Sequence, residues 1–277
     1  LSLEDRTGGS VWNPGSYDPQ LNLVYFGPAP TYDTNSLRVK SGVTGMTSDA
    51  LYTNSTIALN AETGELVWHY QHMANDQLDH DWAYERQLIN LPVNGVMRRA
   101  IVTGGKEAIF EALDAATGDY LFSIDLDMQN VIAEIDPRTG KKTLNQQAVP
   151  KPDQVLDALS LDGICPNALG ARNMQSASYN PITGILYIPM QDTCINNLTG
   201  QRWQKYPDQT SDGLYGMVKA VDLKTHEVIW TQRQFAPPAS GNLTTDSGLL
   251  FSGSVDRYFR AIDQTDGSVL WQRRLDN

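Results

Sequence analysis

The sequence predicts an all-β protein built as a β-propeller, because two hairpin motifs repeat and alternate along it. The first motif is Ala, an apolar residue, Asp or Asn, a Thr-containing turn and a closing Trp or Phe. Each copy reads as a strand, a tight turn that suits Gly, and a second strand. Self-similarity of this kind indicates a repeat architecture. The four copies lie at residues 58–68, 112–122, 220–230 and 261–271.

The second hairpin motif lies between copies of the first. It places a turn between two short apolar segments, at residues 17–27, 179–188 and 245–253. The two hairpins together make four antiparallel strands, which is the content of one propeller blade. A single blade cannot cover both of its faces, so blades of this kind stack in a ring.

We expect one propeller domain over residues 1–277, as a partial ring of about four to five four-stranded blades. The blades are expected at roughly residues 10–70, 71–122, 172–234 and 235–277, with the inner strand of the second blade at residues 100–103. Residues 123–171 are expected to be an irregular insertion, although residues 134–140 imitate the repeated turn. A ring of this blade type needs more units, so the chain is interpreted as part of a larger propeller.

Composition narrows the function classes. The chain has 21 basic and 32 acidic residues, a formal net charge of −11. This balance argues against nucleic acid or an anionic membrane as the main partner, since both require basic surfaces. No apolar run has the length of a membrane-spanning helix. The chain begins with Leu1 rather than Met, which we interpret as a mature product, an isolated domain or a fragment.

The two cysteines, Cys165 and Cys194, each lie near a predicted hairpin. A disulfide between them would indicate an oxidising compartment. Two buried free thiols are the alternative, and the spacing alone does not decide between them.

Candidate site residues lie close to the hairpins. Asp79 and Asp81 point the same way on an extended chain, because side chains alternate with a period of two. Two converging carboxylates favour a bound hard cation such as Ca²⁺, although a solvated acidic loop is the simpler interpretation. Lys106 follows two glycines and is either a surface lysine or a cation for a bound anion. Trp12, flanked by small residues, is either a core residue or a ring with one open face.

The repeats resemble the tryptophan-docking motifs of the quinoprotein alcohol dehydrogenases, the pyrroloquinoline quinone (PQQ) enzymes with an eight-bladed propeller. The resemblance covers nearly the whole chain, which looks like a central-to-C-terminal fragment. Residues 75–81 resemble a family segment that carries the catalytic base, and residues 165–173 resemble the family's Cys-Pro-Ser-Ala-Met-Gly-x-x-Asn. The resemblance also implies the Cys165–Cys194 disulfide.

The resemblance implies the following roles. Asp79 is the counterpart of the catalytic base and, with Asp81, of the metal ligands; Trp12, Lys106 and Asn173 correspond to residues that contact the quinone. An Asp at position 81 is similar to the lanthanide enzymes, so the implied ion is Ca²⁺ or a lanthanide. One departure is Pro30, which falls where the family has a metal-binding Asn and offers no side-chain ligand. The family's glutamate ligand and adjacent-cysteine pair lie in blades that this chain does not contain.

The function implied is oxidation of an alcohol to an aldehyde or ketone, with hydride transfer to metal-bound PQQ. The expected partners are a small alcohol, a cytochrome c-type electron acceptor and the remaining blades, in the periplasm of a bacterium or outside the cell. An isolated arc of blades is expected to have little activity. The competing interpretation is a non-catalytic propeller scaffold of the outer-membrane-assembly type, which explains the repeats and Pro30 but not the site residues.

Overall fold

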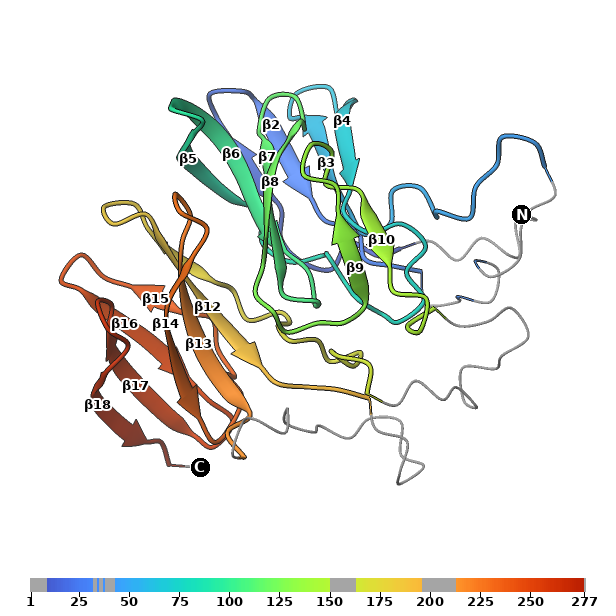
Figure 1. Cartoon of the computed structure of the whole chain (residues 1–277). Helices are drawn as coiled ribbons and strands as arrows, with labels where there is room; N and C mark the ends of the chain where they lie inside the picture. The colour runs from blue at the N-terminus through green and yellow to red at the C-terminus, as the bar shows by residue number, and fades with distance from the viewer. Residues whose placement is uncertain are drawn as a thin grey trace.

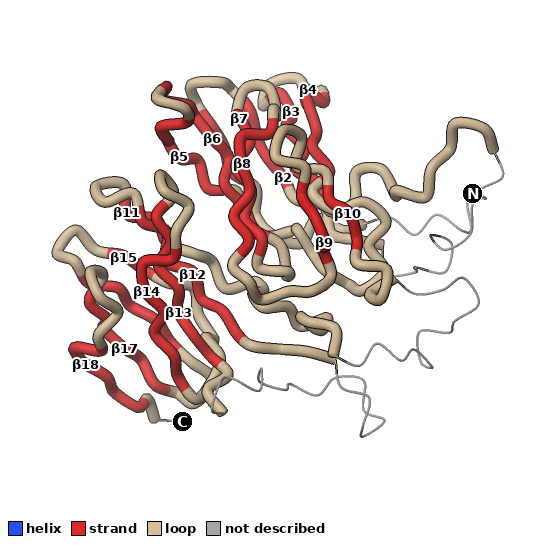
Figure 2. Tube along the Cα trace, viewed as in Figure 1, coloured by secondary structure: helices blue, strands red, loops and turns tan. Residues whose placement is uncertain are grey.

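The regular structure is entirely β-strand, in four antiparallel four-stranded sheets and one two-stranded sheet among the described residues (Figures 1 and 2). The computed structural model describes residues 9–31, 34, 37, 43–149, 163–195 and 213–276. No helix in this part of the chain is long and apolar enough to cross a membrane.

The first two sheets contain the first and second copies of the repeat. The first sheet comprises β1 (Ser16–Asp18), β2 (Leu23–Phe26), β3 (Ser55–Asn60) and β4 (Leu66–Gln71). The second comprises β5 (Gln87–Val93), β6 (Val96–Gly104), β7 (Ile109–Asp114) and β8 (Tyr120–Asp125). In both, the strands pair in sequence order.

The last two sheets have the same order and lie beside each other in yellow to red in Figure 1. They comprise β11 (Ser178–Asn180), β12 (Ile185–Gln191), β13 (Gly216–Asp222) and β14 (Val228–Gln234), then β15 (Leu243–Thr244), β16 (Leu249–Gly253), β17 (Tyr258–Asp263) and β18 (Val269–Arg274). This succession of sheets confirms the predicted partial β-propeller.

One strand assignment was wrong. Residues 100–103 belong to β6, the second strand of its sheet, and β5 takes the inner position. β5 contacts β1 of the first sheet, just as β11 contacts β15. The missed signal is Asn94-Gly95, a two-residue turn with φ of 50° and 77° that joins β5 to β6. Residues of β6 are apolar on both faces because neighbouring sheets cover both faces. This apolar run led to the wrong prediction that β6 is the innermost strand.

The closing aromatics join neighbouring sheets. Trp68 Nε1 donates to the carbonyl of Ala115 at 3.2 Å, and its ring lies over Gly118. A Cβ at Gly118 would come within 2.5 Å of that ring, and Gly118 has a φ of 76°. Trp230 repeats the contact on the carbonyl of Gln264 at 3.0 Å. The aromatic at the end of each motif therefore docks on the turn of the next one.

The joint between the second and third sheets has a different construction. Phe122 stacks on His226, with ring centres 4.1 Å apart, where the other joints have Trp on Gly. The largest apolar cluster also spans this joint, from Ile89 and Phe110 to Ile188 and Met217. A shared core thus supports the joint that lacks a docking tryptophan.

The insertion between β8 and β11 holds a small hairpin and Cys165, whose disulfide partner Cys194 follows β12. β9 (Ile132–Ile135) pairs with β10 (Lys142–Leu144), and the turn between them is the predicted imitation of the repeat. Cys165 and Cys194 form a disulfide, as the resemblance implied.

The topology brings particular loops to one end of the sheets. The inner strands β1, β5 and β11 begin at the end of each sheet where the antiparallel second strands, β2, β6 and β12, finish. Trp12, Asp79 and Asn173 precede inner strands, and Lys106 follows β6. Sheet order alone therefore places these residues at the same end.

Candidate active site

Asp79, Asp81 and Lys106 form one cluster. Lys106 Nζ lies 2.5 Å from Asp81 Oδ2 and 3.3 Å from Asp79 Oδ2, and it donates to the Asp79 carbonyl at 2.6 Å. The side chains of Lys106 and Asp81 are buried, whereas that of Asp79 is 38% exposed. The two carboxylates converge on Lys106, but not through the alternation of an extended chain, because the segment is a loop in which Asp79 has a φ of 62°; Asp79 is the member that solvent reaches.

The backbone of the loop is held by hydrogen bonds from both ends. Asp76 accepts from the backbone N–H groups of Leu78 at 2.9 Å and His80 at 2.7 Å. Asn54, from the edge of β3, donates to Asp76 and accepts from Trp82 N–H. These bonds hold the loop in place. Within it, Asp79 has a left-handed φ of 62°, an unusual conformation for a residue other than Gly.

The carboxylates are not fully satisfied. Asp79 Oδ1 and Asp81 Oδ1 are buried and have no hydrogen-bond partner among the described residues. Burial raises the pKa of Asp79 to about 6, with Lys106 opposing and Asp81 adding to the rise. The pKa of Asp81 is also raised by burial. Unsatisfied buried oxygens are costly, and they are donors suited to a hard cation.

This chain supplies only part of a metal-ligand set. Within the described ranges no group of three or more His, Cys, Asp or Glu side chains is placed to hold an ion. Pro30 is buried and has no donor side chain. The orphaned oxygens of Asp79 and Asp81 fit a Ca²⁺ or lanthanide ion, which would need further ligands from elsewhere.

Trp12 contacts Tyr84, a buried residue beside the cluster. The two rings meet edge to face, with centres 5.8 Å apart and planes at 79°. Trp12 remains 40% exposed. Tyr84 is buried, and the guanidinium of Arg172 lies 4.7 Å from its ring centre. Trp12 is therefore not a core tryptophan, and part of its surface is open to a ligand.

Asn173 lies near the cluster but its side chain is occupied. Its Nδ2 donates to the Leu169 carbonyl at 2.9 Å, and its Oδ1 accepts from Met174 N–H. The preceding segment packs on Lys106, whose carbonyl accepts from Ala171 N–H at 2.7 Å. The structure thus brings Asp79, Asp81 and Lys106 into contact. Trp12 contacts Tyr84, and the Asn173 side chain bonds within its own loop.

Sequence reasoning missed four buried polar residues beside the cluster: His80, Tyr84, Glu107 and Arg172. Arg172 makes a two-pronged ion pair with Glu85, at 2.7 and 2.8 Å, that ties the third sheet to the second. Glu107 Oε1 lies 3.9 Å from His80 Nδ1, and burial raises the pKa of Glu107 to about 8. A signal existed in Lys106-Glu107, two adjacent charges that lead into an apolar strand.

A second buried cluster lies away from the site, between the first two sheets. Glu111 on β7 accepts from Lys142 Nζ at 2.6 Å and lies 2.6 Å from His72 Nδ1. Ser123 also donates to Glu111, and the far nitrogen of His72 meets Thr56 Oγ1 at 2.7 Å. Both oxygens of Glu111 are therefore partnered.

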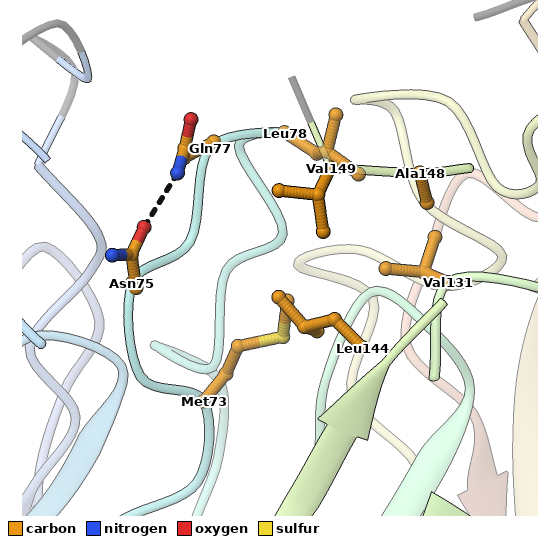
Figure 3. Close-up of a pocket in the computed structure, with 8 residues that line it drawn as sticks. All are labelled: Met73, Asn75, Gln77, Leu78, Val131, Leu144, Ala148 and Val149. Carbon is orange, nitrogen blue, oxygen red and sulfur yellow. Dashed lines mark hydrogen bonds between the residues drawn. The ribbon is translucent and has the colours of Figure 1, made fainter. Parts of the chain in front are cut away.

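A small apolar pocket lies behind the loop that carries Asp79 (Figure 3). Its volume is about 10 Å³, room for about one water molecule. Figure 3 shows Met73 and Leu144 facing each other across it, with Gln77 bonded to Asn75 at 2.6 Å on the loop side. The pocket is a packing gap and too small for an organic ligand.

Comparisons with known proteins show the family to which the chain belongs. The family model described as glucose/ethanol/alcohol dehydrogenase, beta-propeller domain, matches residues 2–162. A second model, outer membrane protein assembly factor BamB, matches residues 215–277. The chain belongs to the first family, the PQQ-dependent dehydrogenases with a β-propeller.

Two curated relatives and one solved structure show the extent of the similarity. The chain is 31% identical to the dehydrogenase subunit of the quinone alcohol dehydrogenase of Acetobacter aceti, over 96% of this chain and 38% of the relative. It is 28% identical to the lanthanide-dependent methanol dehydrogenase of Methylacidiphilum fumariolicum, over 97% and 44%. A europium-containing methanol dehydrogenase superposes with a TM-score of 0.84 at 27% identity, over 97% and 47%. The chain spans less than half the length of these proteins.

Proposed function

We propose that this protein oxidises an alcohol to an aldehyde or ketone with PQQ as the oxidant. The observation that carries the proposal is the cluster of Asp79, Asp81 and Lys106, in which two carboxylate oxygens have no partner among the described residues. Buried charges that remain unsatisfied in a folded protein are typical of a site that binds a ligand.

Each residue has a proposed role. Asp79 removes the proton of the substrate hydroxyl, because it is the carboxylate that solvent and substrate can reach. Lys106 places a positive charge beside the reacting oxygens, and Trp12 supports a flat ring by stacking. Asn173 would contact the cofactor only if its side chain left Leu169. Bound PQQ would supply the quinone that accepts the hydride, with its carbonyl polarised by a cation.

Asp79 and Asp81 are proposed to hold the cation through the oxygens that lack partners. The ion is Ca²⁺ or a lanthanide, because both prefer oxygen ligands in large coordination shells. A second carboxylate at position 81 favours the more highly charged ion. Pro30 leaves one expected ligand position without a donor.

The proposed electron acceptor is a c-type cytochrome, and the proposed location is the bacterial periplasm or the exterior. The Cys165–Cys194 disulfide supports an oxidising compartment. The acidic composition is compatible with a basic electron-transfer partner, which opposite charge would attract.

The test of the proposed base is Asp79→Asn in a protein that carries the complete ring. We expect turnover with alcohol and an electron-accepting dye to fall by roughly 10²- to 10⁴-fold, the contribution of general-base catalysis. PQQ binding, followed by its absorption spectrum, should persist because Lys106 and Trp12 are intact. Asp119→Asn, in an exposed turn, serves as the control. Wild-type turnover in Asp79→Asn would remove Asp79 from this role.

A propeller scaffold without a cofactor is the second candidate, and the match of residues 215–277 to the BamB model favours it. Those residues lie in β13 to β18, outside the cluster of Asp79, Asp81 and Lys106. The two functions separate in one measurement. A complete ring that binds no PQQ in the presence of Ca²⁺ or a lanthanide supports the scaffold and rejects the dehydrogenase.

A further inference from the structure

The hydroxyl of Tyr84 is buried and has no hydrogen-bond partner among the described residues. The ring itself is tightly held. Trp12 contacts it edge to face, and the guanidinium of Arg172 lies 4.7 Å from its centre. Arg172 is in turn fixed by Glu85. The position of the hydroxyl is therefore set by contacts from two separate loops, those of Trp12 and Arg172, and a rotamer change that brought it to water would break them.

Other fully buried tyrosines in the described ranges behave differently. Tyr25 donates to the Ala115 carbonyl at 3.0 Å, and Tyr187 donates to the Gln264 carbonyl at 3.1 Å. Both bonds cross from one sheet to the turn of the next. Burying a hydroxyl without a partner is unfavourable, so an orphaned hydroxyl in a native fold requires an explanation.

The surroundings of Tyr84 indicate the explanation. The charges of Asp81, Glu107 and Asp79 act on its hydroxyl, and Asp79 Oδ1 and Asp81 Oδ1 also lack partners within the described part of the chain. Burial and the charge of Asp81 raise the pKa of Tyr84 well above its ordinary value, so the hydroxyl keeps its proton. Three orphaned oxygens in one cluster are expected where a ligand completes the hydrogen bonds.

We propose that Tyr84 is a further ligand-binding residue of this site, and that its hydroxyl donates a hydrogen bond to an acceptor oxygen of the bound cofactor. The inference rests on the proposed function. PQQ suits it chemically, because its quinone and carboxylate oxygens accept hydrogen bonds and a protonated phenol hydroxyl can donate one. Tyr84 joins Lys106 as a donor and leaves Asp79 and Asp81 for the cation and the substrate.

The test compares Tyr84→Phe with Tyr187→Phe in a protein that carries the complete ring. PQQ titrations in the presence of Ca²⁺, followed by quenching of tryptophan fluorescence, give the dissociation constant. We expect Tyr84→Phe to weaken PQQ binding by about 3- to 10-fold, the range of one hydrogen bond. The absorption band of the bound quinone should shift as the bond is lost. Tyr187→Phe should leave both unchanged.

Thermal unfolding without the cofactor provides the second readout. Tyr84→Phe should keep or raise the melting temperature, because it removes an unsatisfied hydroxyl. Tyr187→Phe should lower it by a few degrees, because it removes a bond that is made. Wild-type affinity and spectrum in Tyr84→Phe would overturn the inference and leave the proposed function in place. A wild-type protein that binds no PQQ would overturn both.

Discussion

Two buried clusters in this molecule each combine carboxylate and lysine, and they differ in whether their hydrogen bonds are complete. In the cluster of Glu111, His72 and Lys142, both carboxylate oxygens have partners. In the cluster of Asp79, Asp81 and Lys106, two carboxylate oxygens have no partner among the residues that the structure describes. The side chains of Lys106 and Lys142 are buried to a similar extent, so burial alone does not distinguish the two clusters.

The difference indicates what each cluster does. A completed network supports the fold, because removal of any member leaves a buried charge. An incomplete network costs stability and persists in an active site, where a ligand completes it. The Glu111 cluster also stacks His72 on Trp82, the residue after Asp81, with ring centres 4.5 Å apart. The Glu111 cluster thereby supports the loop of the proposed active site.

The largest expected effect is on Glu111. Glu111→Ala leaves Lys142 buried without its carboxylate and should lower the free energy of unfolding by about 3–5 kcal/mol. Chemical denaturation measures this loss. Glu134→Ala, on the exposed side of β9, is the control and should change stability by less than about 0.5 kcal/mol. Equal stability of the two variants would mean that the Glu111 cluster is not structural.

The pH dependence of stability tests the same cluster. Burial lowers the pKa of His72 to about 4, so the unfolded chain binds a proton near pH 6.5 that the folded chain does not. Burial favours the neutral form of Glu111, but Lys142 and His72 outweigh it and lower its pKa. The His72 shift makes stability fall as the pH drops below about 6.5, and the Glu111 shift adds a further fall below pH 4.5.

For His72 the loss approaches roughly 3 kcal/mol near pH 4, from about 1.36 kcal/mol per unit of pKa. Denaturation midpoints measured between pH 4 and 8 give the slope. His72→Gln should flatten the slope between pH 6.5 and 4. An unchanged slope in that variant would show that His72 is not the group responsible.

The smallest effect on stability is expected at Asp81. Asp81→Asn removes a charge that repels Asp79, while Lys106 keeps its contacts with Asp79. The free energy of unfolding should therefore change by less than about 1 kcal/mol. Cation affinity should fall at least about tenfold, and more for a lanthanide than for Ca²⁺, when measured by calorimetry on the complete ring. If Asp81→Asn lowered stability but left cation affinity unchanged, the cluster of Asp79, Asp81 and Lys106 would support the fold rather than bind a cation.

Much of the fold was predictable because its signals are local. The turn, the Gly at positive φ and the closing aromatic all lie within one hairpin, as Trp68 and Trp230 illustrate. The inner position of β5 was not predicted, because position within a sheet depends on which strands pair over long distances. The convergence of Asp79 and Asp81 was predicted from an extended chain, but it arises in a loop in which Asp79 has a left-handed φ of 62°.

Tyr84 shows what sequence reasoning cannot reach. Nothing in its neighbourhood along the chain distinguishes it from Tyr25 or Tyr187. Its hydroxyl lacks a partner because Trp12 and Arg172, distant in sequence, hold the ring in one place. The same holds for Asn173, whose position was predicted but whose side chain bonds within its own loop.

The amino-acid sequence by itself determined the repeat, the all-β class, the family and the residue types of the candidate site, since each depends on spacing within a few tens of residues. Tertiary structure alone decided which buried polar atoms have partners. Hydrogen bonding depends on distances of about 3 Å between groups that different sheets supply, and no spacing along one chain specifies those distances.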